Sequence, residues 1–133
     1  MDIPVRSRLK LFPSVALVSV LALEICPRMA QTQNAASAPK VDYQRDVQPI
    51  LQKNCYVCHS ASSQMSGLRL DNRQALLAGG NSGKIVVPGS ADTSTLYERV
   101  AGTGGLARMP FGGDPLPPEQ VKLIRAWIDQ GAK

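Results

Sequence analysis

Two of the three cysteines and the only histidine of the chain stand together in the sequence CYVCH, residues 55–59. This order and spacing is the pattern of c-type haem attachment. Two thiols at this separation can add to the two vinyl groups on one edge of a porphyrin, and the adjacent imidazole can then ligate the iron. We therefore predict one covalently attached haem c, with Cys55 and Cys58 as the thioether residues and His59 as an axial ligand.

Three other uses of paired cysteines fit the chain less well. A structural zinc site needs four Cys or His ligands around the ion, whereas this motif supplies three that are nearly contiguous. A thioredoxin-like dithiol would follow a β-strand, but the segment before Cys55 has apolar residues at helical spacing. A disulfide between Cys55 and Cys58 would close a loop too small to stabilise the fold much. Cys26 lies in the N-terminal leader and is given no role.

The second axial ligand of such a haem would be a methionine, because the chain has no second histidine. Met65 follows His59 too closely to pass around the edge of the ring, so we expect it at the surface or in the pocket wall. Met109 lies much further along, in a Gly-rich segment without helical or strand periodicity, and Pro110 favours an extended conformation for it. We predict Met109 as the second iron ligand. The alternative is that Met109 fills a gap in the core, as methionine often does.

The N-terminus has the features of a secretory leader. A basic stretch, residues 1–10, precedes the apolar run 11–23, which is too short to span a bilayer and suits a signal-peptide core. A buried core helix is the alternative for this run. We assign residues 1–30 to a signal peptide with cleavage within 22–38, and residues 31–40 to a flexible linker. The protein is then extracytoplasmic, in the periplasm or secreted, and would contact a membrane only if the leader were retained as an anchor.

Charge and composition narrow the partners of the folded part. The chain carries a net charge of +5, but its basic residues are scattered, so we expect no nucleic-acid partner. Hydrophobic residues make up 44% of the chain and aromatic residues 5%, so a group other than aromatic side chains has to complete the core. Burying a haem would contribute on the order of 10 kcal/mol at about 25 cal/mol per Å². We therefore expect the apoprotein to be poorly folded.

Capping signals and apolar periodicity predict an all-α domain over residues 41–133, with about four short helices joined by long Gly/Pro loops. The first helix would begin at Asp42 or at Asp46 and end at Asn54. Asp46 suits the sequence better, because Pro49 then lies in the first turn, where a missing N–H costs no hydrogen bond.

The other three predicted helices follow the motif. Asp71 is predicted to cap a helix over residues 72–78 that stops at a pair of glycines. Thr95 and Glu98 form a candidate capping box for the next helix, which ends at residue 100. The last helix covers residues 117–131. The residues expected to face inward on these last two helices are Leu96, Tyr97, Val100, Val121, Ile124, Trp127 and Ile128.

The remaining apolar and basic residues suggest how the haem pocket is completed. We expect Trp127 to pack the last helix across the first near Tyr43. The loop residues predicted to line the pocket are Leu68, Leu70, Ile85, Val86, Val87, Leu106 and Leu116. Four basic residues could pair with the haem propionates or lie on the solvated surface, and we assign none: Arg69, Arg73, Lys84 and Arg99.

The ordered motifs of the chain resemble the Planctomycete-type cytochrome c domain. They are DVQPIL at 46–51, CYVCH at 55–59, GLRLD at 67–71, VPGS at 87–90, RMP at 108–110 and IRAWIDQGA at 124–132. The resemblance covers about residues 41–133. It implies a compact, class-I-like cytochrome c bundle around one haem, attachment at Cys55 and Cys58, and iron ligation by His59 and Met109. Phe111 stands where the family commonly has a second proline.

These observations together predict a mono-haem electron carrier that is not an enzyme, because electron transfer requires no protein acid, base or nucleophile. Its partner would be another redox protein, which the sequence does not identify. Two alternatives stay open. The iron could be five-coordinate, for gas sensing or peroxidase-like chemistry, if Met109 does not bind it. The domain could also be the electron-entry module of a larger secreted enzyme, since such domains often stand at the head of longer secreted proteins.

Overall fold

The computed structural model describes residues 39–133. The predicted signal peptide and most of the predicted linker lie outside the described residues. Within them the chain forms four α-helices and no strand, so the all-α class is confirmed. No helix in this part is long and apolar enough to cross a membrane. The elements in chain order are the π-helical turn η1 (Tyr43–Val47), α1 (Gln48–Asn54), η2 (Met65–Gly67), α2 (Arg73–Ala78), η3 (Ala91–Thr93), α3 (Thr95–Ala101) and α4 (Pro118–Asp129).

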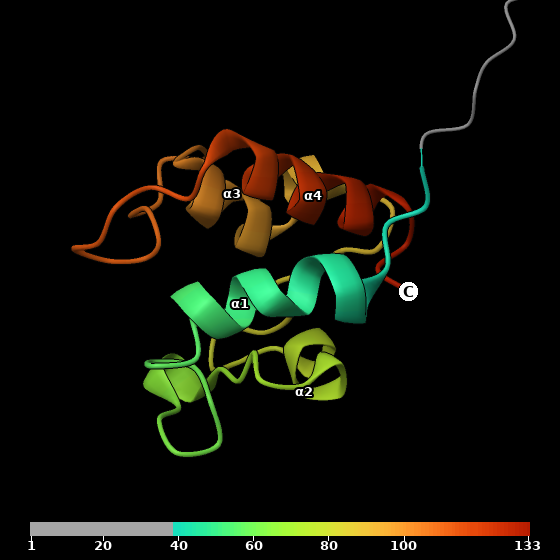
Figure 1. Ribbon diagram of the computed structural model, residues 1–133. Helices are drawn as coiled ribbons and strands as arrows, with labels where there is room; N and C mark the ends of the chain where they lie inside the picture. The colour runs from blue at the N-terminus through green and yellow to red at the C-terminus, as the bar shows by residue number, and fades with distance from the viewer. Residues whose placement is uncertain (1–38) are drawn as a thin grey trace, which may run out of the picture. The chain divides into compact units, whose positions relative to one another are not determined.

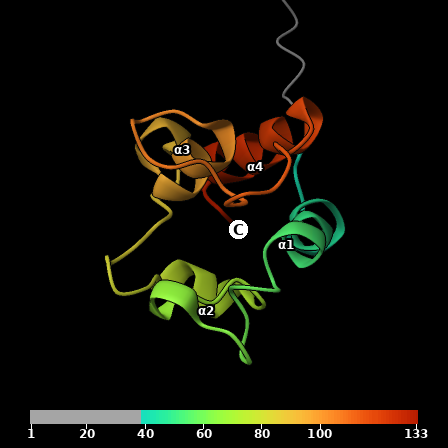
Figure 2. The same ribbon diagram turned by 90° about the vertical axis from the view of Figure 1, so that its left-hand side faces the viewer.

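The four short helices are stacked, with α3 and α4 at the same level (Figure 1). α3 and α4 lie side by side in one layer, with α1 beneath them and α2 further below (Figure 1). The view turned by 90° shows the four helices arranged around the C-terminal end of the chain (Figure 2). Arg73, at the start of α2, donates two hydrogen bonds of 2.6 and 3.1 Å to the carbonyl of Ala132. These bonds tie α2 to the segment that follows α4.

Of the two predicted starts of the first helix, Asp42 is the N-cap, and the favoured Asp46 is not. The Asp42 carboxylate accepts the N–H three residues on, and Asp46 Oδ2 accepts the N–H of Asp42 at 2.8 Å, so the two aspartates cap reciprocally. The expectation failed because a π-helical turn precedes Pro49, with the Gln48 N–H donating to the Tyr43 carbonyl. A helical period alone does not reveal such a turn.

The second helix is capped by Asn72 rather than by the predicted Asp71. Asn72 Oδ1 accepts the N–H of Ala75 at 2.8 Å. Asp71 instead accepts the N–H of Ala61 at 2.8 Å and pairs with Arg69 at 3.0 Å. Both oxygens of the Asp71 carboxylate are therefore engaged elsewhere, which leaves the cap to the next residue.

The predicted capping box of Thr95 and Glu98 does not form. The N-cap position of α3 is Ser94, and its hydroxyl makes no capping bond. That hydroxyl is fully buried, accepts the Val87 N–H at 2.8 Å and donates to the Ser90 carbonyl at 2.7 Å. Ser94 thus fixes the chain that leads into the helix rather than the helix end itself.

α4 is fastened to the α3 side of the layer by a charged cluster. Arg125 Nη2 pairs with Asp92 at 2.7 Å, and its Nη1 donates to the Tyr97 hydroxyl at 2.9 Å. The guanidinium also lies 5.0 Å from the centre of the Tyr97 ring, within the range of a cation–π contact. Of the three α3 residues expected to face inward, Leu96 and Val100 are buried, whereas Tyr97 packs at the edge of the core.

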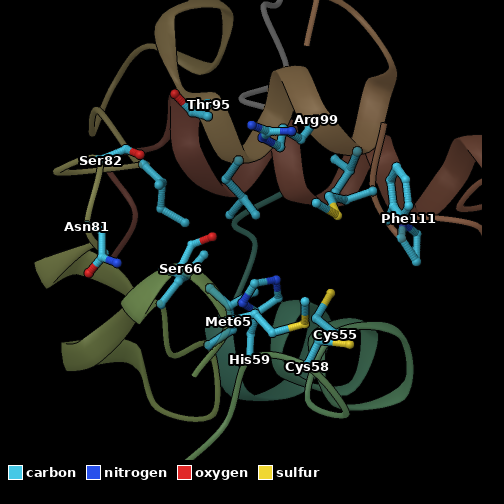
Figure 3. Close-up of a pocket in the computed structure, with 18 of the residues that line it drawn as sticks. Cys55, Cys58, His59, Met65, Ser66, Asn81, Ser82, Thr95, Arg99 and Phe111 are labelled. Carbon is cyan, nitrogen blue, oxygen red and sulfur yellow. The ribbon is translucent and has the colours of Figure 1, made fainter. Parts of the chain in front are cut away.

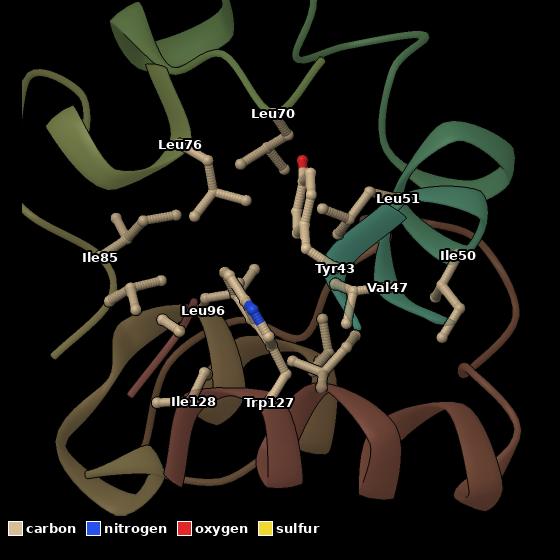
Figure 4. Close-up of a cluster of buried hydrophobic side chains, with 14 of the residues drawn as sticks. Tyr43, Val47, Ile50, Leu51, Leu70, Leu76, Ile85, Leu96, Trp127 and Ile128 are labelled. Atoms are coloured by element: carbon tan, nitrogen blue, oxygen red, sulfur yellow. The ribbon is translucent and has the colours of Figure 1, made fainter. Parts of the chain in front are cut away.

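Trp127 packs the last helix against the first, as predicted. Its ring centre is 5.4 Å from that of Tyr43, and the two planes are tilted by 41° (Figure 4). The indole Nε1 donates to the carbonyl of Lys133 at 3.0 Å, so its polar atom is satisfied inside the core. Val121 packs at the edge of this core. The largest fully buried apolar side chains are Trp127, Leu51, Leu76, Ile124, Ile128, Val47 and Val86.

The hydroxyl of Tyr43 gives this core a pH dependence. Burial raises the pKa of Tyr43 to about 12, from an ordinary value of 10.0, and the hydroxyl has no hydrogen-bond partner among residues 39–133. The neutral phenol therefore stabilises the fold fully below pH 10, and this contribution is lost as the pH rises toward 12.

We expect Tyr43→Phe to lose less stability than the wild type between pH 10 and 12, by on the order of 1 kcal/mol once solvent screening is allowed for. Urea unfolding of both proteins at pH 7 and across this alkaline range measures the difference. Parallel losses in the two proteins would show that Tyr43 does not titrate in the folded state as described.

The end of α2 depends on a glycine. Gly79 has a φ of +91°, and a Cβ at this position would collide with the carbonyl of Gly83. Gly83 has a similar φ of +88°, but a Cβ there would meet nothing within 4 Å. We expect Gly79→Ala to lower the free energy of unfolding by about 2–4 kcal/mol, and Gly83→Ala by about 1 kcal/mol from backbone strain alone. Equal losses in urea unfolding would contradict the collision at Gly79.

Candidate functional site

A cavity of about 340 Å³ opens beside the CYVCH segment, within the usual size range of small-molecule sites. Four parts of the chain line it. They are the end of α1 with the motif that follows, the segments on either side of α2, one face of α3, and the loop between α3 and α4. Most of the lining side chains are apolar, and a few polar ones stand among them (Figure 3).

The backbone of the motif folds tightly just after α1. Cys55 is the C-cap of the helix, and its N–H donates to the carbonyl of Leu51 at 2.8 Å. The N–H groups of Cys58 and His59 then both donate to the Cys55 carbonyl, at 3.1 and 2.9 Å. This turn brings Cys55, Cys58 and His59 to the same wall of the cavity (Figure 3). Both cysteines are free thiols, with Cys58 exposed and Cys55 half-buried.

His59 is held by its backbone while its ring lacks a partner. Its carbonyl accepts the Leu70 N–H at 2.9 Å, which fixes the main chain on that side. Ring atom Nδ1 is buried and has no hydrogen-bond partner among residues 39–133. A buried polar atom without a partner is costly and needs an explanation. Because Nδ1 is inaccessible, the other ring nitrogen, Nε2, is the atom that could bind a group that enters the cavity.

Met109 reaches the same cavity from the loop after α3. It is half-buried, and its N–H donates to the carbonyl of Arg99 at 2.9 Å. Figure 3 shows Arg99 and Phe111 across the pocket from His59, so this part of the lining faces the wall that carries the histidine. The structure therefore brings all four predicted site residues to one cavity, with His59 and Met109 on different elements.

Met65 lines the cavity but is 59% exposed, which agrees with the expectation of a surface or pocket-wall position. Its N–H donates to the carbonyl of Cys58 at 3.1 Å, so its main chain lies beside the motif. Both methionines described by the structure thus border the cavity, and each can be tested separately.

The predicted apolar lining is partly wrong. Leu68, Leu70 and Ile85 line the cavity as expected. Val86 and Leu116 lie in the core instead. Val87 and Leu106 are exposed, by 43% and 38%. In the segment after α2, Ile85 borders both the cavity and the core, whereas its neighbour Val86 lies in the core and not in the cavity lining.

Several residues that line the cavity were not predicted to do so from the sequence. Leu96 and Val100 were expected to face inward, and they border the cavity as well as the core. Asn81 and Ser82 come from the turn closed by the bridge between Gly80 and Gly83. The turn was visible as a Gly-rich segment, but the direction of its polar side chains was not. Phe111 is 80% exposed at the cavity and had only its unusual place after Pro110 as a signal.

One of the four basic residues considered as propionate partners lines the cavity. Arg69 is engaged by Asp71, and Arg73 donates to the backbone after α4. Lys84 is exposed and lies outside the lining. Arg99 is the only Lys, Arg, Asp or Glu among the described lining residues. The polar residues Asn81, Ser82 and Thr95 lie on the side of the pocket away from Cys55 and Cys58 (Figure 3).

The alternatives to haem attachment gain no support from the geometry. Burial raises the pKa of the Cys55 thiol to about 11, with nearby Cys58 adding to the effect, whereas a reactive dithiol needs a lowered thiol pKa. No strand precedes Cys55 in the described residues, so the thioredoxin arrangement is missing there. Residues 39–133 also hold no group of three or more His, Cys, Asp or Glu side chains placed to bind a metal ion.

Residues 55–111 match the family model of Planctomycete cytochrome C. The matched segment begins at the first cysteine of the motif and ends just after Met109 and Pro110, so it contains all four predicted site residues. The predicted family resemblance is thereby confirmed over residues 55–111, whereas the motifs at 46–51 and 124–132 lie outside the matched segment. No curated protein and no solved structure matches the chain.

Proposed function

Because residues 55–111 belong to the Planctomycete cytochrome C family, which binds haem c, we propose that this protein is a mono-haem electron carrier. One observation supports the proposal above the others. Two free thiols, the His59 imidazole and the Met109 side chain all border one largely apolar cavity. In this proposal the four helices form a cytochrome c-like bundle around a single haem.

Each residue of the motif has its own task in the proposed site. Cys55 and Cys58 would hold the haem covalently, since addition of each S–H group across a vinyl double bond gives a thioether with no leaving group. The tight backbone turn between them brings both cysteines to one wall of the cavity, where they would hold the vinyl side of the haem. His59 supplies a ring nitrogen to the iron from the same wall. Bound haem supplies a one-electron ferric/ferrous couple.

Met109 completes the coordination in this proposal. Met109 lines the cavity from the loop after α3, a different segment from the one that carries His59. A thioether ligand stabilises ferrous over ferric iron and so raises the reduction potential. The apolar residues around the site act in the same direction, because a low dielectric disfavours the extra charge of the ferric form. A six-coordinate iron has no open position for oxygen or peroxide, so the protein is proposed as a carrier and not an enzyme.

The polar part of the lining suits the carboxylate edge of a haem. Vinyl and propionate groups lie on opposite edges of the porphyrin, so thioethers at Cys55 and Cys58 direct the propionates toward the other side of the cavity. Asn81, Ser82 and Thr95 lie there and offer amide and hydroxyl donors. The residues proposed to hold the two ends of the haem are thus separated as its chemistry requires.

Electrons would pass through the exposed side of the cavity. Val57, Met65 and Phe111 are 83%, 59% and 80% exposed, and the last two line the cavity itself. We propose that another redox protein docks on this side, close to the thioether edge. The extracytoplasmic location follows from the family, whose cytochrome c domains are typically extracytoplasmic, and from the predicted leader. Membrane contact would require the leader to be retained, and no nucleic-acid partner is proposed.

Met109→Ala tests the proposed ligation. In the matured ferric protein we expect the weak long-wavelength absorption band of methionine-ligated haem c, and we expect it to vanish in this variant. Carbon monoxide should bind the reduced variant readily and the reduced wild type poorly, because only the variant has an open position on the iron.

Met65→Ala is the matched control, since Met65 also lines the cavity, and it should keep both the band and the resistance to carbon monoxide. A wild type that lacks the band and binds carbon monoxide readily would contradict the carrier and favour a five-coordinate sensor or peroxidase-like site. If the band vanished in Met65→Ala and not in Met109→Ala, the iron ligand would be Met65 and the proposed ligation by Met109 would be wrong.

A further inference from the structure

The loop that carries Met109 is long and sparsely tied to the rest of the fold. It runs from the end of α3 at Ala101 to the start of α4 at Pro118 and contains no helix or strand. Segments with few hydrogen bonds and little burial open locally at low free-energy cost. A methionine on such a loop needs a local restraint if it is to remain at the cavity.

Three described hydrogen bonds connect this loop to α3 beyond the glycine that caps the helix. The Thr103 N–H donates to the Glu98 carbonyl at 2.9 Å, at the very start of the loop. The other two both involve Arg99. Its carbonyl accepts the Met109 N–H at 2.9 Å, and its Nη1 donates to the Ala107 carbonyl at 2.9 Å.

We propose that Arg99 is the positioning residue of the distal loop and keeps the Met109 thioether at the cavity. The inference rests on the proposed function, because it concerns how the proposed iron ligand is held. Arg99 bonds to the loop on both sides of residue 108. Its main-chain carbonyl accepts the Met109 N–H, and its guanidinium donates to the Ala107 carbonyl. The two bonds together fix the direction of the chain at the position where the Met109 side chain leaves it.

The side-chain bond is the part that substitution can remove. A cationic donor makes a stronger hydrogen bond to a carbonyl than a neutral one does. The bond between the Met109 N–H and the Arg99 carbonyl involves only main-chain atoms and persists in any variant. Loss of the guanidinium should therefore loosen the loop without releasing it. We expect a rise in the population of the open loop of roughly five-fold, which corresponds to about 1 kcal/mol, the usual net value of one hydrogen bond.

Arg108 provides a matched control on the same loop. It carries the same charge and directly precedes Met109, but it is exposed. Its described hydrogen bond, of 3.5 Å, goes to the carbonyl of Gly113, which belongs to the same loop. Removing the Arg108 guanidinium changes the charge beside Met109 by the same amount and breaks no described bond between loop and helix.

The test is an imidazole titration of the ferric holoprotein, followed by its absorption spectrum. Imidazole competes with Met109 for the iron, so its apparent affinity reports how often the loop is open. We expect Arg99→Met to bind imidazole roughly five-fold more tightly than the wild type, and Arg108→Met to stay within about two-fold. Methionine keeps the apolar stem of arginine and removes its donors, which limits the loss of packing. Arg99→Lys, which retains a cationic donor, should recover part of the wild-type resistance.

Met109→Ala sets the upper limit of the titration and separates the two proposals. Tight imidazole binding in Met109→Ala with wild-type affinity in Arg99→Met would overturn the role of Arg99 while leaving the ligation intact. Equal affinities in all variants, Met109→Ala included, would overturn Met109 as the ligand and the role of Arg99 with it. Should Arg99→Met fail to mature, Arg99→Leu, which also has no side-chain donor, replaces it with the same expected gain and the same contradicting result.

Discussion

The contact between Trp127 and Tyr43 is the interaction on which the rest of the structure depends. It joins the last helix of the chain to the first, two elements that lie far apart in the sequence. Because α1 ends directly at Cys55, the same contact places the CYVCH motif relative to α3 and α4. Full burial of a tryptophan contributes on the order of 3–5 kcal/mol, judged from the cost of its removal, a large share of the stability of a small domain.

The frame built on this contact leaves a hollow at the motif end of α1. Short helices and long loops leave it unfilled, and Phe111 is the one aromatic residue among the described lining residues, at 80% exposure. The chemistry around the hollow is unevenly distributed. The segment after α1 lines the cavity with the cysteine thiols and the imidazole of His59. The segment after α2 adds polar side chains, and the loop between α3 and α4 adds Met109. This distribution matches the two unlike edges and two faces of a haem, which is the physical basis of the proposed carrier.

The sequence revealed those features that depend on neighbouring residues. CYVCH could be interpreted directly because its chemistry depends on fixed local spacing, and the four helices were found from periodicity. The helix starts differed from the predicted ones where two candidate caps compete. At Asp71, an ion pair with Arg69 and a hydrogen bond from the Ala61 N–H occupy the carboxylate, and a linear pattern does not show these bonds. Loop side chains were the hardest to place. Leu116 lies in the core and Leu106 is exposed, and their directions depend on packing partners that a linear pattern does not show.

The central claim is that this cavity holds one covalently attached haem c, and the intact mass of the protein tests it most directly. The chain should be matured in cells that contain the haem-attachment machinery, extracted with acidified acetone to remove loose haem, and weighed by mass spectrometry. The account predicts the mass of the processed chain plus one haem, and no added haem in the double variant Cys55→Ser, Cys58→Ser. An unmodified chain with two alkylatable thiols at Cys55 and Cys58 would contradict it.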